Sequence, residues 1–301
     1  MDKFDLRQHF RFSLECVAAK WENGLWHVTF VNTRTGEKVI KQCRLLLTAV
    51  GGFSQPRRVK FPGMESFGGH MFHTAEWDHS FDWRGKRVAV IGNGCSAAQV
   101  VPSIAKGVTK LTQYARSPQW YHERPNKPFS RVERFCFRYL PLWQRYYRLD
   151  LFLKTDELAS VYGPSEWQVK ARKRVEQSAR EYIYKSAPER YHNFIVPDFP
   201  LGCKRRIYDP GYLKSLHYDH VDLLPEGIKE ITATGIISES GKVEDFDAIV
   251  LATGFDVTSF LTPLAVTGKN GASLHRQWRE HRGAQAYMGT FVHNFPNFAI
   301  M

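Results

Sequence analysis

Residues 92–97 have the types and the spacing needed to bind the phosphates of a dinucleotide. They read Gly92, Asn93, Gly94, Cys95, Ser96 and Ala97, which is the G-x-G-x-x-A arrangement. The first glycine permits a tight turn after a strand, the second lets the backbone approach a pyrophosphate, and the small alanine lets helix and strand pack closely. Amides at the start of the helix then face the phosphates with the positive end of the helix dipole. The motif predicts a dinucleotide site.

The neighbouring residues predict the elements that this motif needs. Residues 87–91 form a short run rich in β-branched side chains, and residues 96–105 suit a helix that Gly107 can end. Residues 110–114 are a second strand candidate. Together they predict one complete Rossmann βαβ unit, a context that an ordinary glycine turn does not require.

The residues after the second strand indicate which cofactor binds. An NAD site usually has an acidic residue there, which binds the ribose 2′-hydroxyl. This chain has Arg116 and Ser117 instead. Arginine suits a 2′-phosphate because its planar fork binds phosphate oxygens and keeps its charge. We therefore expect NADPH rather than NADH, the alternative being that Arg116 is an ordinary surface arginine.

A second motif lies just before the βαβ unit. Residues 67–78 fit the pattern F-x-G-x-x-x-H-x-x-x-W-D through Phe67, Gly69, His73, Trp77 and Asp78. This pattern resembles the fingerprint of Baeyer–Villiger monooxygenases, flavoenzymes that insert an oxygen atom beside a ketone carbonyl. Related flavin-containing monooxygenases usually carry another aromatic residue in place of Trp77. We expect a connector between nucleotide-binding regions rather than a catalytic centre, with His73 and Trp77 on one face if it is helical.

The resemblance extends over nearly the whole chain. Residues 202–212 are similar to the family segment that carries the active-site arginine, and residues 247–256 resemble its second glycine turn. By this resemblance Arg205 would stabilise the negative charge that develops during oxygen insertion, a role that suits a permanently charged group. Lys204 would lie near the NADP 2′-phosphate beside Arg116. The alternative is an exposed basic cluster.

The resemblance implies an enzyme that uses FAD and NADPH as cofactors. It would convert a ketone and O₂ into an ester or lactone, and the many aromatic residues would suit a bulky ketone of secondary metabolism. A flavin monooxygenase that oxidises nitrogen or sulfur is the alternative within redox chemistry. Outside it, the alternative is a non-catalytic NADP-binding remnant or a subunit that completes another chain.

The implied fold is an α/β flavoprotein with two dinucleotide-binding domains. Residues 12–50 predict a β meander that ends in a buried apolar strand, and residues 228–254 repeat this pattern. The expected domains are a partial FAD-binding domain and an NADPH-binding domain with a helical insert. Their bounds are residues 1–66 and 205–301 for the first, residues 67–204 for the second, and about 120–200 for the insert.

The chain departs from the family at its ends. Family members begin with another G-x-G-x-x-G turn, which binds the ADP part of FAD, and no such motif precedes Gly92. The family's last flavin-contacting segment is also missing. We expect a chain truncated at both ends that retains FAD weakly, because strands such as Leu45–Leu47 and Ile249–Leu251 would lose packing partners.

Composition argues against several other classes of protein. Hydrophobic residues make up 43% of the 301 residues and charged residues 24%, as in ordinary folded proteins. The net charge is +12, but no nucleic-acid-binding module is present. The five cysteines lack C-x-x-C spacing, so we expect no metal site and reduced thiols in the cytoplasm. No run approaches the ~18 apolar residues of a transmembrane segment.

Residues 135–153 combine aromatic side chains with interleaved arginines. An amphipathic helix of this kind can lie on a membrane surface, so peripheral membrane contact is one expectation. The other, which we favour from the sequence, is a helix whose apolar stripe packs against the rest of the protein.

Overall fold

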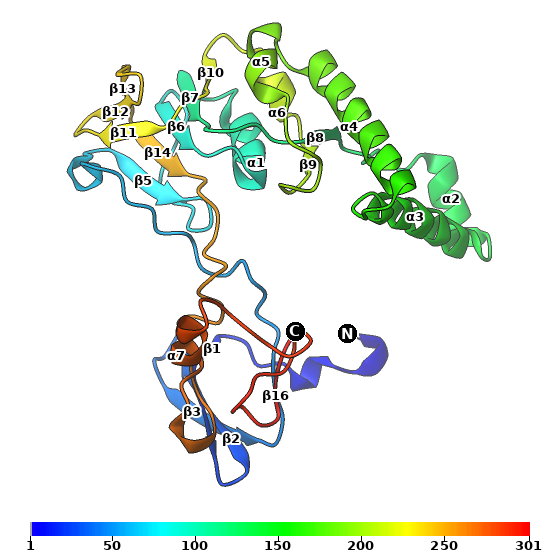
Figure 1. The fold of residues 1–301 in the computed structure, drawn as a ribbon, viewed down its shortest axis with the longest axis vertical. Coiled ribbons are helices and arrows are strands. Elements are labelled where there is room, and N and C mark those ends of the chain that lie inside the picture. Colours follow the sequence, from blue (N-terminus) through cyan, green and yellow to red (C-terminus); the bar gives the residue numbers. More distant parts are fainter. Residues whose placement is uncertain (1) are drawn as a thin grey trace. The chain divides into compact units, whose positions relative to one another are not determined.

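The computed structural model describes residues 2–301, apart from the side chains of Glu157 and Ser160 (Figure 1). The chain forms two compact units. The first combines Met1–Arg58 with Phe255–Met301, and the second is Val59–Gly254. In residues 2–301, no helix has both the length and the apolar character to cross a membrane.

The centre of the second unit is a five-stranded sheet in which every pair of neighbouring strands is parallel. Its three inner strands β7, β6 and β14 are almost entirely buried, as expected for parallel strands that are covered on both faces. The strands predicted at residues 87–91 and 110–114 are confirmed. In sheet order the strands are β10 (Val221–Leu224), β7 (Lys110–Tyr114), β6 (Arg87–Ile91), β14 (Ala248–Leu251) and β5 (His70–His73).

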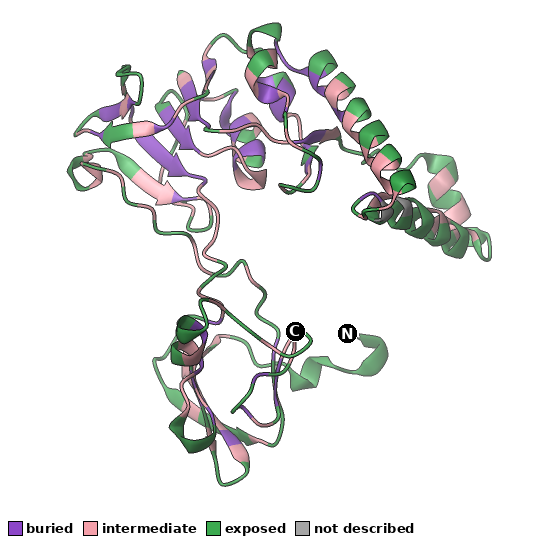
Figure 2. Ribbon diagram, in the orientation of Figure 1, coloured by how far each residue is buried: buried purple, intermediate pink, exposed green. Residues whose placement is uncertain are grey.

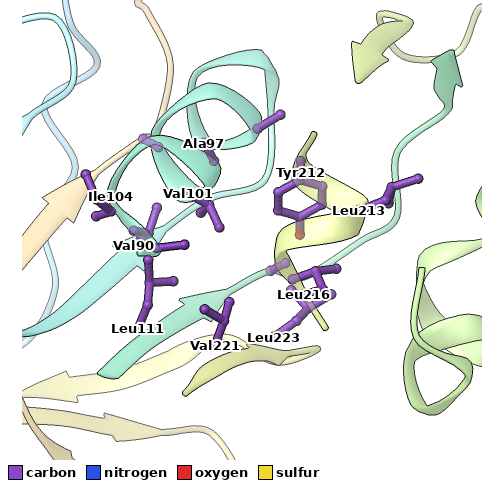
Figure 3. Packing of buried hydrophobic residues seen from close by; sticks show 14 of the residues in the cluster. Val90, Ala97, Val101, Ile104, Leu111, Tyr212, Leu213, Leu216, Val221 and Leu223 are labelled. Atoms are coloured by element: carbon purple, nitrogen blue, oxygen red, sulfur yellow. The ribbon is translucent and has the colours of Figure 1, made fainter. Parts of the chain in front are cut away.

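Helix α1 (Cys95–Ile104) connects β6 to β7 and completes the predicted βαβ unit. Ala97, Val101 and Ile104 are buried, and their spacing places them on one face of the helix against the sheet (Figure 3). The same core includes residues of three further helices. These are α4 (Glu166–Ser186), α5 (His192–Ile195) and α6 (Tyr212–Ser215).

A small antiparallel meander covers the other face of this sheet. Ile231 and Ile236 of the meander pack in one cluster with Ala89 and Ile249 of the sheet. The parallel sheet therefore lies between a helical layer and a β layer. The meander strands are β11 (Ile228–Ile231), β12 (Gly235–Ser238) and β13 (Val243–Asp245).

These contacts place the unit boundaries differently from the expectation. Residues 205–254, expected in the FAD-binding domain, belong to the second unit because β10 pairs with β7 and β14 pairs with both β5 and β6. Residues 59–66 also belong to it. The two meanders predicted at 12–50 and 228–254 exist, but each lies in a different unit.

The segment between β8 (Tyr121–Glu123) and β9 (Ile207–Asp209) is mostly helical. At its base β8 pairs in parallel with β9, and Trp120 and Leu201 contribute to a small buried cluster. Beyond this base, α2 (Arg131–Tyr139) and α3 (Trp143–Ser160) carry many exposed apolar side chains (Figure 2). The expectation that the apolar stripe of residues 135–153 packs against the protein is therefore wrong.

The first unit is built around an antiparallel meander with one added parallel strand. Trp26, Trp278 and Phe298 belong to its core. The strands in sheet order are β15 (Ala265–Thr267), β1 (Leu14–Glu22), β2 (Leu25–Asn32) and β3 (Lys38–Cys43), and the helix is α7 (Leu274–Glu280). Short 3₁₀ turns complete the described elements of the chain at Asp2–Phe4, Arg7–His9, Met64–Ser66, Glu189–Tyr191 and Lys269–Gly271.

A parallel pair formed by β4 (Leu46–Thr48) and β16 (Phe298–Ile300) also lies in the first unit. Leu45 and Leu47 are 55% and 53% exposed, whereas Thr48 is buried. The expected burial of this apolar strand is wrong, because β4 belongs to a two-stranded pair and the side of Leu47 faces solvent. Residues Ile249–Leu251, expected to lose partners, are instead buried in the sheet of the second unit.

Asp209 holds the start of α6. Its buried carboxylate accepts hydrogen bonds from the amides of Gly211 and Tyr212 through Oδ1, and from the hydroxyl of Tyr182 through Oδ2 at 2.9 Å. The side chain thus joins the end of β9, the first turn of α6 and helix α4.

Replacing Asp209 by alanine should destabilise the second unit, because the amides of Gly211 and Tyr212 and the hydroxyl of Tyr182 lose their acceptor. We expect the free energy of unfolding to fall by about 2 kcal/mol, as for loss of a helix cap. Urea denaturation measures the change. The matched control is Asp219→Ala, which removes an exposed carboxylate from the segment after α6 and should leave stability nearly unchanged. Equal effects of the two substitutions would contradict the assignment.

Candidate dinucleotide-binding site

The turn after β6 is held by close contact with the turn after β14. Gly92 has a φ of +113°, and a Cβ atom there would lie 2.4 Å from the carbonyl oxygen of Ala252. The Gly92 amide donates to the carbonyl of Tyr114 at 3.0 Å. Only glycine satisfies both the backbone angle and the contact. The motif predicted the tight turn, and the structure adds the close contact with Ala252.

The second glycine has the opposite surroundings. A Cβ atom at Gly94 would meet no atom within 4 Å. Gly94 is the N-cap residue of α1, and the first turn of α1 contains no acidic residue. The amides of Cys95, Ser96 and Ala97 have no intrahelical acceptors, since they open the helix. This is an open cradle lined by backbone donors, and it fits a phosphate.

Two buried polar side chains hold the turn through consecutive hydrogen bonds. The hydroxyl of Tyr212 donates to Oε1 of Gln113 at 2.7 Å, and Nε2 of Gln113 donates to the carbonyl of Gly92 at 2.8 Å. Burial raises the pKa of Tyr212, which keeps its hydroxyl protonated and able to donate. Sequence reasoning missed both side chains; the signal was a polar residue, Gln113, within a strand expected to be buried.

The end of β7 brings the other predicted nucleotide residues together. Asn93 Nδ2 donates to the carbonyl of Ser117, and Lys204 Nζ donates to the hydroxyl of Ser117. Arg116 precedes Ser117 and is exposed. Burial lowers the pKa of Lys204, and the negative charge of Asp198 opposes this effect. The predicted proximity of Lys204 to the Arg116 segment is thus observed.

Arg205 lies in a pocket of 450 Å³ that reaches the first turns of α1 through Cys95 and Gln99. Arg124 and Arg206 line the same pocket. Three guanidinium groups beside a helix N-terminus create a positive potential that suits an anionic ligand. The sequence singled out Arg205 by resemblance; Arg124 lies after β8 without a recognisable motif, and folding of the insert places it here.

The fingerprint segment is a strand followed by turns, not a helix or a connector. His73 ends β5 and is buried, its Nδ1 accepts from the amide of Ala75 at 3.1 Å, and its carbonyl accepts from the amide of Glu76 at 2.8 Å. Trp77 packs edge-to-face on Phe72, with ring centroids 5.0 Å apart. His73 and Trp77 therefore do not share a helical face.

Other fingerprint residues have evident structural roles. A Cβ atom at Gly69 would lie 2.5 Å from the carbonyl oxygen of Asp247 and 2.7 Å from the ring of Phe67, so glycine is needed where β5 enters the sheet. Asp78 Oδ1 accepts from the amide and hydroxyl of Ser80, and these hydrogen bonds lower the pKa of Asp78. Its Oδ2 lies 3.4 Å from Nδ1 of His70.

The fingerprint nevertheless ends at the same sheet edge as the glycine turn. Leu251 of β14 is in register with His73 of β5 on one side and with Ile91 of β6 on the other. The amide of Thr74 donates to the carbonyl of Leu251, and the amide of Ala252 donates to the carbonyl of Ile91. Ligands of open parallel sheets bind at this carboxyl edge.

Comparisons with known proteins agree with this geometry. Residues 2–133 match the family described as flavin-binding monooxygenase-like. A Baeyer–Villiger monooxygenase of Pseudomonas aeruginosa is 33% identical over 307 residues, which include 100% of this chain and 56% of that protein. An FAD-binding monooxygenase of Aspergillus niger is 32% identical over 308 residues, which include 99% of this chain and 50% of that protein.

A solved structure of OTEMO in complex with FAD and NADP has the same fold, with a TM-score of 0.79 and 26% sequence identity. The match covers 100% of this chain and 62% of the OTEMO chain. The α/β architecture is therefore shared with a two-nucleotide flavoprotein. The chain spans about half the length of the curated relatives described above.

The two glycines of the turn should respond differently to alanine. Gly92→Ala adds a Cβ atom against the backbone of Ala252 at a positive φ, and we expect a loss of about 1–3 kcal/mol of unfolding free energy. Gly94→Ala is the matched control. Its Cβ atom would point into open space, so the free energy of unfolding should change by less than about 0.5 kcal/mol. Urea denaturation compares them, and similar losses would contradict the packing described here.

Proposed function

Since this chain belongs to the flavin-binding monooxygenase-like family, we propose that its second unit binds NADP(H) in an FAD- and NADPH-dependent oxidation of a ketone. The observation that carries the nucleotide part is the open cradle at Gly94, which backbone amides line and in which no acidic residue opposes an anion. The ketone and the oxygen insertion extend this proposal by analogy with the relatives, and the cytoplasmic location rests on the cysteine pattern of the sequence.

Two groups of residues would hold the nucleotide. The amides of Cys95, Ser96 and Ala97 would receive the pyrophosphate, with Gly94 leaving room for its approach. Arg116 and Lys204 would bind the 2′-phosphate at the end of β7. Lys204 already contacts Ser117 there, so it needs little rearrangement to reach a phosphate beside Arg116. An acid at this edge would favour NADH, and none follows β7 directly.

Bound NADPH supplies a hydride, and this chain's residues would bind the nucleotide and stabilise charge near it. Arg205 is the residue to which we assign charge stabilisation during oxygen insertion. A guanidinium cannot release its proton at neutral pH, so it stabilises a developing anion without entering proton transfer. Its pocket with Arg124 and Arg206 adds to the positive potential.

FAD enters the proposal through the relatives, one of which is an FAD-binding monooxygenase. The first unit has no second cradle like that at Gly94 among its described residues. The G-x-G spacing occurs in this sequence at Gly92 alone. Between β4 and the end of the first segment of that unit at Arg58, the described residues contain no helix that could act as α1 does. A second candidate function is a non-catalytic NADP-binding module.

Cofactor preference tests the nucleotide assignment. The double variant Arg116→Ala/Lys204→Ala should lose about 10²–10⁴-fold in affinity for NADP⁺ while affinity for NAD⁺ changes little, because each of the two lost charged hydrogen bonds contributes about 1.5–3 kcal/mol. Titration calorimetry with both nucleotides measures the ratio. Lys106→Ala removes an exposed lysine after α1 as the control. An unchanged preference would show that these residues do not bind the 2′-phosphate.

Product analysis tests the reaction. With NADPH, added FAD and O₂, the chain should convert a ketone to an ester or lactone in preference to oxidising an amine or sulfide. Arg205→Ala should slow ester formation by about 10²–10³-fold, the range found when a group that stabilises a transition-state anion is removed. Arg174→Ala, an exposed arginine of α4, is the control.

The outcomes separate the candidate functions. Oxidation of amines or sulfides without ester formation would replace the ketone proposal by an N- or S-oxidising one. NADP⁺ binding without any oxidation would support the non-catalytic module. Failure to bind NADP⁺ would refute the nucleotide assignment itself.

A further inference from the structure

Helix α2 exposes the face that a packed helix would bury. Val132, Phe135 and Tyr139 are 70%, 57% and 59% exposed. Their spacing of three and four residues aligns them in one stripe along the helix. None of the residues of α2 is buried. The apolar side of an amphipathic helix therefore points to solvent, which is the reverse of the usual arrangement.

Helix α3 also exposes apolar side chains. Tyr146, Leu149 and Leu153 are 66%, 54% and 56% exposed and are again spaced three and four residues apart. The two helices are held together by other residues: the ring of Phe137 lies 5.1 Å from that of Phe129 and 5.2 Å from that of Tyr147, centroid to centroid. The exposed stripes are thus not needed for packing within the hairpin.

Positive charge surrounds these apolar stripes. Residues 131–160, which span both helices, include six basic and four acidic residues, a net charge of +2. On α2 a stripe of arginines at positions 131, 134 and 138 repeats the spacing of the apolar stripe and adjoins it. The guanidinium of Arg138 lies 5.4 Å from the ring centroid of Tyr139. The basic residues of the two helices are Arg131, Arg134, Arg138, Arg145, Arg148 and Lys154.

We propose that the exposed face of α2 and α3 docks on a lipid bilayer that contains anionic headgroups. The aromatic and leucine side chains would enter the boundary between headgroups and acyl chains, while the arginines contact lipid phosphates. This occupant matches both the charge and the apolar character of the surface. A second copy of this chain would bring the same arginine stripe of α2 to the contact, which opposes self-association.

Vesicle binding tests the proposal and does not depend on NADP(H) or on catalysis. The full chain is mixed with vesicles of phosphatidylcholine containing phosphatidylglycerol, and with vesicles of phosphatidylcholine alone, and bound protein is measured by co-sedimentation. We expect binding to the anionic vesicles that weakens as salt rises, because screening reduces the arginine contribution. Absence of binding to anionic vesicles would overturn the proposal.

Two double variants separate the apolar and charged contributions. Phe135→Gln/Tyr139→Gln should reduce binding by about tenfold or more, since each substitution removes apolar surface that would be buried in the bilayer. Arg134→Gln/Arg138→Gln should reduce it by about 25-fold, at about fivefold per arginine near an anionic surface. Glutamine is a good helix former, so the helices should persist, which circular dichroism checks.

Helix α4 offers matched controls with equally exposed side chains. Trp167→Gln/Tyr184→Gln removes two aromatic residues that are 59% and 51% exposed, and Lys173→Gln/Arg174→Gln removes two exposed positive charges. Both should leave vesicle binding within about twofold. Equal losses in control and test variants would contradict a specific role for α2 and α3. If the parent chain elutes as a dimer in size-exclusion chromatography and the Phe135→Gln/Tyr139→Gln variant elutes as a monomer, the surface binds a second copy of the chain instead.

Discussion

The candidate site depends on one close backbone contact at the carboxyl edge of the parallel sheet. Gly92 can follow β6 as it does because it has no Cβ atom to meet the carbonyl of Ala252. That contact in turn requires β14 to lie beside β6, in register through Leu251 and Ile91. The same register brings the end of β5 to this edge. The ends of β5, β6 and β14, which are far apart in the sequence, therefore lie together at one edge of the sheet.

Buried polar groups then hold the surrounding loops at that edge. The hydrogen bonds from Tyr212 through Gln113 to Gly92 connect the segment after the helical insert to the glycine turn. Ser117 accepts from Lys204 and, through its carbonyl, from Asn93, so it joins the same two parts of the chain at the surface. The base of the insert is thus well tied to the sheet, whereas its tip, α2 and α3, exposes apolar stripes. Rigid attachment of an exposed surface is what docking on another body requires.

Much of the second unit was predictable because its signals are local. The β-branched run before Gly92 and the helical spacing after it fix strand and helix through nearest neighbours, and residues 87–91 and 110–114 form strands as expected. The fingerprint was harder to interpret. Its spacing of His73 and Trp77 allows a helix, but pairing of β5 with β14 makes the segment a strand, and Gly69 is needed for an approach to Asp247 that no local pattern reveals.

The sequence by itself determined the dinucleotide turn, the βαβ unit and the family resemblance, since these depend on residue types at short spacing. Only the tertiary structure decided that residues 205–254 belong to the second unit, that Leu45 and Leu47 are exposed, and that Arg124 joins Arg205 beside α1. It also decided that the apolar stripes of α2 and α3 face solvent. The physical reason is that apolar periodicity defines which face of an element is hydrophobic, whereas burial depends on which distant segment covers that face.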